Sequence, residues 1–277
     1  WSLEEKSSED LFVMNGKVEA TVMTTLESGE TVDVIIRMQD AVDLTKLSTS
    51  LSAKSKIDKA ETVVDQLQTV AKSSKADVMK QLKAFEKSKE VSDVQQLWVI
   101  NGIAATVTKD ALKELAKRKD IKSIMKDIEI HAPEVETEET KPSLPEWGLE
   151  KIFAPRVWGE YNLQGEGIVV GIMDTGVSGK HEALRHNYRG RDGQHQYSWI
   201  DVSGNGYETP NDGNGHGTHV AGSAVGGGAG EPIGVAPGAD WIAAKIFDDN
   251  GRATASGIHQ AFEWFLAPGG DASKAPD

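Results

Sequence analysis

The sequence predicts an α/β protein with two domains: a ferredoxin-like α+β domain over residues 31–131 and a parallel-sheet α/β domain over residues 147–277. In the first range, strand and helix patterns follow the order strand, helix, strand, strand, helix, strand. The second range contains a continuous apolar run at 168–173, typical of a strand buried on both faces of a parallel sheet. Prolines and glutamates at 132–146 predict a solvated linker between the two domains.

The first elements follow from the spacing of apolar residues. Residues 1–30 mix Ser, Glu and Lys and are interpreted as a polar lead-in, with a weak strand signal over 18–23. Apolar and polar residues alternate over 32–38, the pattern of a half-buried strand. Apolar residues then recur with the helical period over 57–85, which predicts one long amphipathic helix.

A tight turn divides the next stretch into two strands. The pair Asn-Gly at 101–102, which favours short hairpin turns, lies between two apolar runs. Thr108 can cap the helix that follows, and we expect this helix to end near Lys119. A last strand over 121–130 completes the first domain, with Ile128 and Ile130 on one side.

The composition excludes several classes of protein. A net charge of −13 argues against nucleic-acid binding, which needs clustered Lys and Arg. No apolar run approaches the roughly 20 residues that a membrane-spanning helix requires, so we expect no membrane partner. The chain has no cysteine and therefore forms no disulfide.

Two residues of the second domain have the chemistry of an acid–base pair. Asp174 ends the predicted strand at 168–173, and functional groups of parallel sheets lie at the carboxyl ends of strands. His216 lies in a glycine-rich stretch that leads into a short helix, where an imidazole is held firmly and stays accessible. A carboxylate can hold an imidazole in one tautomer and stabilise the imidazolium.

Two other interpretations of this histidine stay open on its residues alone. His216 and His219 lie three apart on one helical face, a spacing that also allows a metal pair. The HExxH pattern of zinc proteases is absent, so we expect no metal here. A purely structural histidine in a glycine-rich turn is the other interpretation, and the presence of Asp174 upstream argues against it.

Two motifs resemble blocks of the subtilisin-like serine proteases: Asp-Thr-Gly at 174–176 and His-Gly-Thr-His-Val-Ala-Gly at 216–222. The resemblance implies that residues 147–277 are the N-terminal part of a subtilisin-like catalytic domain. Asp174 would orient His216, and His216 would act as the base for a serine. The Gly-Thr-Ser that carries this serine in the family does not occur in the sequence. We therefore expect the 277-residue chain alone to be inactive.

The resemblance also implies partners for the catalytic domain. Residues 31–131 correspond to a propeptide that acts as an intramolecular inhibitor and chaperone, and residues 132–146 contain the maturation site. Peptide or protein substrates would pair through backbone bonds with an edge segment. That segment contains Gly251, Arg252, Ala253 and Thr254. The family further implies secretion into the extracellular space.

The sequence departs from the family at the usual calcium site. Residues 226–232 do not resemble the calcium loop that follows the histidine helix, so calcium stays possible and we predict no site for it. No other cofactor is expected. A rival hypothesis is that the chain is a non-catalytic inhibitory or binding fragment left by processing.

Overall fold

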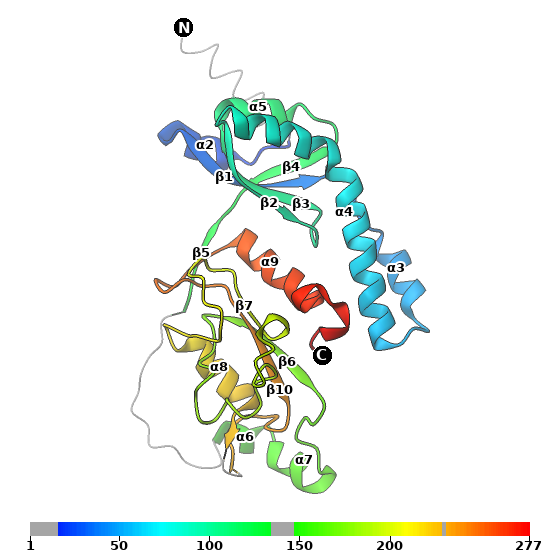
Figure 1. Ribbon diagram of the computed structural model, residues 1–277, viewed down its shortest axis with the longest axis vertical. Helices are drawn as coiled ribbons and strands as arrows, with labels where there is room; N and C mark the ends of the chain where they lie inside the picture. Colours follow the sequence, from blue (N-terminus) through cyan, green and yellow to red (C-terminus); the bar gives the residue numbers. More distant parts are fainter. Residues whose placement is uncertain (1–15, 134–146, 229–230) are drawn as a thin grey trace. The chain divides into compact units, whose positions relative to one another are not determined.

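The computed structural model of the chain describes residues 16–133, 147–228 and 231–277 (Figure 1). The chain divides into two compact units, with the boundary between Ile128 and Glu129. Each unit has a hydrophobic core of its own. The boundary falls inside the stretch 121–130, which was predicted as a single strand.

The first unit is an antiparallel sheet with the strand order β2-β3-β1-β4. Its strands are β1 (Thr31–Met38), β2 (Val91–Leu97), β3 (Gly102–Thr108) and β4 (Ile121–Lys126). Helix α4 (Lys56–Lys87) lies between β1 and β2 in the chain, and α5 (Lys109–Ala116) lies between β3 and β4. This order confirms the predicted ferredoxin-like α+β domain.

The periodicities in the sequence explain these elements. Strand β1 alternates buried and exposed side chains over most of its length, as a strand with one covered face does. Helix α4 turns Val78 and Leu82 into the same core. The Thr108 hydroxyl accepts a hydrogen bond from the Ala111 N–H and so caps α5, as predicted.

The hairpin between β2 and β3 forms, but its turn is longer than predicted and ends one residue earlier. Residues 98–101 make the turn, and Gly102 already begins β3. Asn101 takes the left-handed conformation, with φ 47°, which asparagine tolerates better than most residues. Its side-chain amide donates to the Asp40 carbonyl and accepts from the Ser74 hydroxyl, so the turn is fixed to two neighbouring segments.

The interpretation of residues 1–30 as a lead-in is wrong for helix α2 (Ala20–Ser28), and the weak strand signal there is wrong as well. Val22, Met23 and Leu26 lie on one face of α2 and are buried in the core of the first unit. Because burial of three large apolar side chains stabilises the helix, its polar remainder does not prevent folding.

The predicted last strand over 121–130 is also wrong as a single element. Strand β4 ends at Lys126, and Asp127 makes the final bond to β1 through the Asp33 carbonyl. Ile128 is 51% exposed. The chain then forms β5 (Glu129–His131), which belongs to the second unit. The common face predicted for Ile128 and Ile130 does not form.

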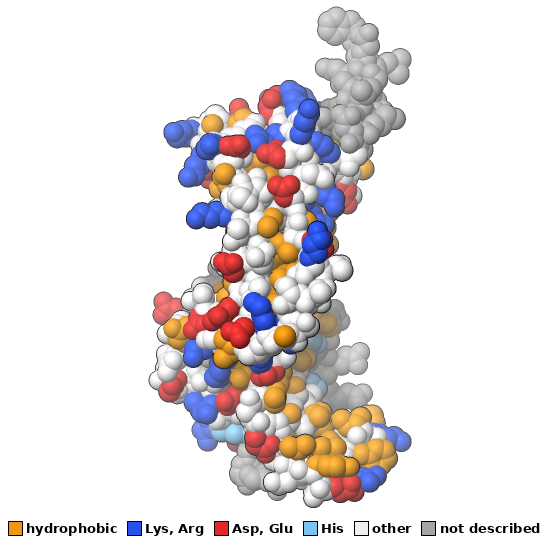
Figure 2. All heavy atoms as spheres, turned by 90° about the vertical axis from the view of Figure 1, so that its right-hand side faces the viewer, with side chains coloured by type: hydrophobic (Ala, Val, Ile, Leu, Met, Phe, Trp, Pro, Cys, Tyr) orange, Lys and Arg blue, Asp and Glu red, His pale blue; other side chains and the backbone are white. Residues whose placement is uncertain are grey.

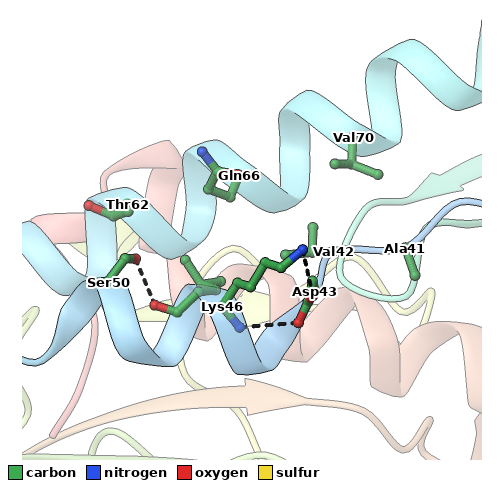
Figure 3. A pocket seen from close by; sticks show the side chains of 9 residues that line it. Ala41, Val42, Asp43, Lys46, Ser50, Thr62, Gln66 and Val70 are labelled. Atoms are coloured by element: carbon green, nitrogen blue, oxygen red, sulfur yellow. Dashed lines mark hydrogen bonds and ion pairs between the residues drawn. The ribbon is translucent and has the colours of Figure 1, made fainter.

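Helix α3 (Leu44–Leu51), which the sequence did not predict, lies beside α4 and forms a shallow hollow with it (Figure 3). The hollow has a volume of about 360 Å³. Its charged groups pair with each other, because the Asp43 carboxylate caps α3 and lies 3.4 Å from the Lys46 ammonium. The charged groups of the hollow therefore give no indication of a bound ligand.

The second unit contains a parallel sheet with the strand order β6-β10-β7. Its strands are β6 (Val169–Asp174), β7 (Trp199–Asp201) and β10 (Asp240–Lys245). The other strands are β8 (Gly227–Gly228), β9 (Glu231–Pro232) and β11 (Arg252–Thr254). The helices are α6 (Trp147–Lys151), α7 (Ala154–Tyr161), α8 (His216–Val225) and α9 (Ala255–Leu266), with short 3-10 turns η1 (His195–Tyr197), η2 (Pro268–Gly270) and η3 (Ala272–Lys274). The predicted parallel-sheet α/β fold is confirmed.

The strand predicted to be buried on both faces is at the edge of this sheet. Strand β6 pairs only with β10 among the described strands, and of its side chains only Ile172 is fully buried. The central strand β10 is instead buried almost throughout. The two apolar runs look alike in the sequence, and their burial differs because one has a neighbour on each side.

A group of exposed apolar side chains covers α6 and α7. Figure 2 shows hydrophobic side chains gathered at the level of α7. The exposed residues of this surface include Trp147, Ile152, Phe153, Val157 and Tyr161. Within the described ranges, no helix is both long and apolar enough to cross a membrane.

Candidate active site

Asp174 and His216 meet at the carboxyl end of the parallel sheet. Asp174 is the last residue of β6, and His216 is the first residue of α8. The His216 Nδ1 atom lies 2.7 Å from Asp174 Oδ1, and the two side chains are 29% and 13% exposed. The Thr175 N–H also donates to Asp174 Oδ1, over 2.7 Å. The carboxylate is thus held from its own strand while it faces the ring.

Glycine makes this approach of helix and strand possible. The first turn of α8 lies so close to the Asp174 segment that a Cβ on Gly217 would be 2.0 Å from the Gly176 carbonyl oxygen. Gly215 before the helix has φ 101°, a left-handed conformation that glycine adopts at little cost. The glycines of this stretch therefore allow the close contact between the helix and the Asp174 segment.

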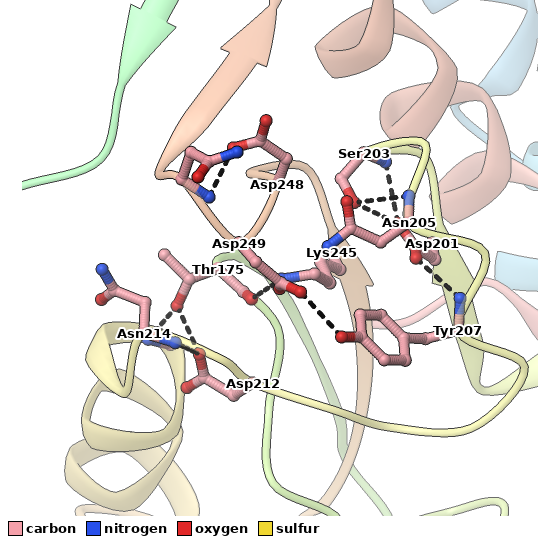
Figure 4. A network of polar contacts seen from close by, with 12 residues as sticks. Thr175, Asp201, Ser203, Asn205, Tyr207, Asp212, Asn214, Lys245, Asp248 and Asp249 are labelled. Atoms are coloured by element: carbon pink, nitrogen blue, oxygen red, sulfur yellow. Dashed lines mark hydrogen bonds and ion pairs between the residues drawn. The ribbon is translucent and has the colours of Figure 1, made fainter.

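Thr175 connects the two segments. Its hydroxyl accepts a hydrogen bond from the Gly217 N–H over 2.9 Å and donates to Asp212 over 2.9 Å (Figure 4). Asp212 in turn accepts from the N–H groups of Asn214, Gly215 and Thr218 and from the Thr218 hydroxyl. The conformation of the loop before α8 is therefore fixed by hydrogen bonds to the Asp212 carboxylate.

The charge of Asp212 is favoured by these donors. Burial disfavours the ionised carboxylate, but the hydrogen bonds from Gly215, Thr218 and Asn214 together outweigh it and lower the pKa of Asp212 below its usual 3.8. A negative charge beside the first turn of α8 also interacts favourably with the helix dipole.

This lowered pKa predicts a loss of stability in acid. Because the folded pKa is depressed, the stabilisation by Asp212 is present above the unfolded value and is lost as the pH falls through the folded value. Asp212→Asn should lower the free energy of unfolding at pH 7 and reduce its decrease between pH 6 and pH 3. Urea titrations at several pH values measure both. Glu182→Gln, at an exposed position, is the control and should leave the pH dependence as it is.

The predicted substrate segment forms a strand that already has a partner. Arg252, Ala253 and Thr254 make up β11, which pairs antiparallel with β5. The Gly251 carbonyl accepts a hydrogen bond from the Ala132 N–H over 2.8 Å, just beyond the paired residues. Ile130 and Ala132 pack on the apolar cluster that includes Phe247 and Ala253.

Several predicted features have a definite place in the structure. Asp174 and His216 lie together, whereas His219 is exposed and has no carboxylate ion pair in the described parts of the chain. Among the described residues, no group of three or more His, Cys, Asp or Glu side chains could hold a metal ion. The proposed maturation site lies mostly in residues 134–146, outside the described ranges.

Sequence reasoning missed Asp212, Thr175 and Lys245. Asp212 precedes His216 by four residues, and its signal is a carboxylate placed to cap the coming helix. Lys245 is a charged residue inside the apolar stretch 241–247, a pattern that indicates a buried ion with a specific partner.

Two protein-family models match separate parts of the chain. Residues 165–273 match the subtilase family, and residues 33–133 match the peptidase inhibitor I9 family. The second match ends just beyond β5, so it includes the strand that pairs with β11.

The chain also resembles individual proteases. It is 29% identical to bacillopeptidase F of Bacillus subtilis over 92% of its own length, and 35% identical to subtilisin-like protease 1 of Arthroderma otae over 59%. It spans 20% and 31% of these two relatives. Among solved structures, the epidermin leader peptide processing serine protease of Staphylococcus aureus has the same fold. The TM-score is 0.55 at 18% identity, over 87% of this chain and 49% of that chain.

Proposed function

We propose, from the membership of residues 165–273 in the subtilase family and of residues 33–133 in the peptidase inhibitor I9 family, that the chain is part of the precursor of a serine endopeptidase. The observation that carries the proposal is the 2.7 Å contact between His216 Nδ1 and Asp174 Oδ1. The chain spans 20% and 31% of the two curated relatives, so we assign the nucleophilic serine to the rest of the complete protein.

The geometry of the pair determines the direction of proton transfer. An ionised Asp174 can only accept a hydrogen bond, so the Nδ1 atom of His216 carries the proton between them. The Nε2 atom is then unprotonated and can accept the proton of a serine hydroxyl as that oxygen attacks a peptide carbonyl. Asp174 stabilises the imidazolium that results, and His216 returns the proton to the leaving amine.

The second part of the proposal is that β5 inhibits the enzyme by occupying the substrate strand. A substrate that pairs with β11 needs the same backbone groups of Arg252, Ala253 and Thr254 that β5 uses. The alternating side chains of β5 support this view. Ile130 packs on the apolar cluster, whereas Glu129 and His131 are exposed. Apolar residues at alternate positions of a substrate would bind the same cluster.

This occupation predicts the effect of a charge at position 130. Ile130→Asp would place a carboxylate on the apolar cluster, so β5 should leave β11 more easily and the uncleaved complete protein should hydrolyse a fluorogenic peptide about ten-fold faster or more. The rate of the uncleaved protein is divided by the rate of the same sample after maturation is complete. This ratio corrects for the amount of folded enzyme. His131→Asp, on the exposed side of β5, is the matched control. Equal initial rates for the two variants would contradict the inhibitory pairing.

A serine-directed probe tests the enzyme proposal as a whole. The complete protein, after maturation, should react with a fluorophosphonate at one serine and hydrolyse a denatured protein substrate. The rival hypothesis of a binding or inhibitory fragment expects neither result. We further propose, from the family alone, that the complete protein is secreted.

A further inference from the structure

Lys245 is the last residue of the central strand β10 and has a fully buried side chain. It lies next to Asp174 in the register of the parallel sheet, and the Asp174 carbonyl accepts the N–H of the following residue, Ile246. An ammonium at such a position costs free energy unless it is paired and hydrogen-bonded. Its contacts therefore indicate what the charge does.

The Lys245 ammonium has two polar partners on opposite sides (Figure 4). It donates to the Thr175 carbonyl over 2.8 Å, and it lies 3.2 Å from Asp249 Oδ1. The Tyr207 hydroxyl donates to the other oxygen of Asp249 over 2.7 Å, and the Tyr207 ring lies 5.8 Å from the ammonium. The hydrogen bond from Tyr207 is the main cause that lowers the pKa of Asp249. Burial opposes it, and the hydrogen bond and charge of Lys245 add to the lowering.

Each polar group of Thr175 has a different partner, and Lys245 binds the carbonyl. The Thr175 N–H holds Asp174, its hydroxyl connects Gly217 with Asp212, and its carbonyl accepts from Lys245. A residue fixed at these three groups cannot rotate without moving the Asp174 carboxylate. Stability alone does not explain the ammonium, since apolar residues in place of a buried ion pair are often equally stable.

We propose that Lys245 is a positioning residue whose buried ammonium, held by Asp249, fixes the Thr175 carbonyl and so sets the Asp174 carboxylate against the His216 ring. The inference rests on the Asp174–His216 pair of the proposed function. It adds a residue that touches neither the substrate nor the proton, and that acts through one peptide group.

The charges around this site make the proposal testable without enzymatic activity. Asp174 and Asp212 are the carboxylates beside the first turn of α8, and Lys245 with Asp249 adds a cation and an anion on the strand side. If the ammonium acts on the pair, its removal by Lys245→Met should raise the pKa of His216. Asp249→Asn leaves the ammonium uncompensated and should lower the same pKa.

The experiment measures the His216 pKa by NMR in the 277-residue chain, with His216→Gln to assign the signal. We expect opposite shifts of the His216 pKa of roughly 0.5–1 unit for Lys245→Met and Asp249→Asn. Each variant changes one unit charge close to the Asp174–His216 pair. The strongly deshielded Nδ1 proton should be present in the wild type and broadened in Lys245→Met. Lys180→Met, at an exposed position, should change neither signal.

The outcomes separate this inference from the proposed function. Absence of the Nδ1 proton signal in the wild type would overturn the Asp174–His216 pair itself. If that signal is present and stays as sharp in Lys245→Met as in the wild type, only the positioning role of Lys245 is overturned, whatever the pKa shifts. Opposite pKa shifts show that His216 responds to the two charges, whereas broadening of the Nδ1 signal shows that the Asp174–His216 contact depends on the ammonium. If Lys245→Met does not fold, the Nδ1 signal of Asp249→Asn decides. It should broaden if Asp249 holds the ammonium in place, and an unchanged signal would overturn the positioning role. The Asp249 side chain is 42% exposed, so its replacement leaves the core intact.

Discussion

Replacement of His216 by alanine in the complete protein should reduce turnover about 10⁶-fold, and Asp174→Asn should reduce it about 10⁴-fold. Losses of this size follow when the histidine or aspartate of an Asp-His-Ser catalytic triad is replaced. The first change removes the base that accepts the serine proton. The second keeps the shape of the carboxylate but favours the wrong tautomer of the ring. Initial rates on a fluorogenic peptide, normalised to folded protein, measure both.

His219→Ala is the matched control, because His219 lies on the same helix with an exposed side chain. It should leave turnover essentially unchanged. A loss in this variant as large as that of His216→Ala would contradict the assignment of the base.

The same argument predicts that the 277-residue chain alone does not react with a fluorophosphonate. Its sequence contains no Gly-Thr-Ser, and the hydroxyl nearest in sequence to His216 is engaged elsewhere. Thr218 donates to Asp212 over 2.6 Å and accepts from the Ser178 N–H over 3.0 Å. Mass spectrometry of the treated chain should find it unmodified. Stoichiometric labelling that His216→Ala abolishes would reveal a nucleophile within these residues.

Gly217→Ala should destabilise the second unit by about 3 kcal/mol. The new Cβ would lie 2.0 Å from the Gly176 carbonyl oxygen and 3.0 Å from the Asp174 Cβ, so backbone has to move against backbone. The shift would also separate His216 from Asp174. Urea unfolding gives the loss of stability, and the Nδ1 proton signal of His216 reports the separation.

Gly222→Ala is the control for this prediction, since it lies in the same helix and its Cβ would meet no atom within 4 Å. Alanine favours the helical conformation over glycine, so this variant should be as stable as the wild type or more stable by up to about 1 kcal/mol. Equal destabilisation by both substitutions would mean that the close contact at Gly217 has no special effect.

Local patterns in the sequence predicted the elements whose formation depends on residues close together in the chain. The long amphipathic helix is α4, the Thr108 cap begins α5, and the apolar run that ends in Asp174 is β6. The two motifs also identified the Asp174–His216 pair, because each motif joins a functional group to glycines that permit close packing.

Features that depend on partners far apart in the chain could not be predicted in this way. Helix α2 is stable through burial of three side chains in the core, and the strand over 121–130 divides because β5 pairs with β11 more than a hundred residues later. No function was assigned to Lys245 from the sequence. The role proposed for it follows only from its contacts with Thr175 and Asp249, which the fold brings within reach of the ammonium.

The pairing of β5 with β11 has a consequence for how the proposed inhibition depends on dilution. While residues 132–146 join β5 to the rest of the second unit, β5 and β11 meet at an effective concentration that for short linkers is of millimolar order. A substrate must then compete with β5 for β11, and dilution does not weaken this competition because β5 is covalently attached. After a cut between β5 and α6, the same contacts form only at the actual concentration of the freed segment. If β5 inhibits as proposed, one broken peptide bond would make the inhibition weaken on dilution, although the contacts between β5 and β11 are the same.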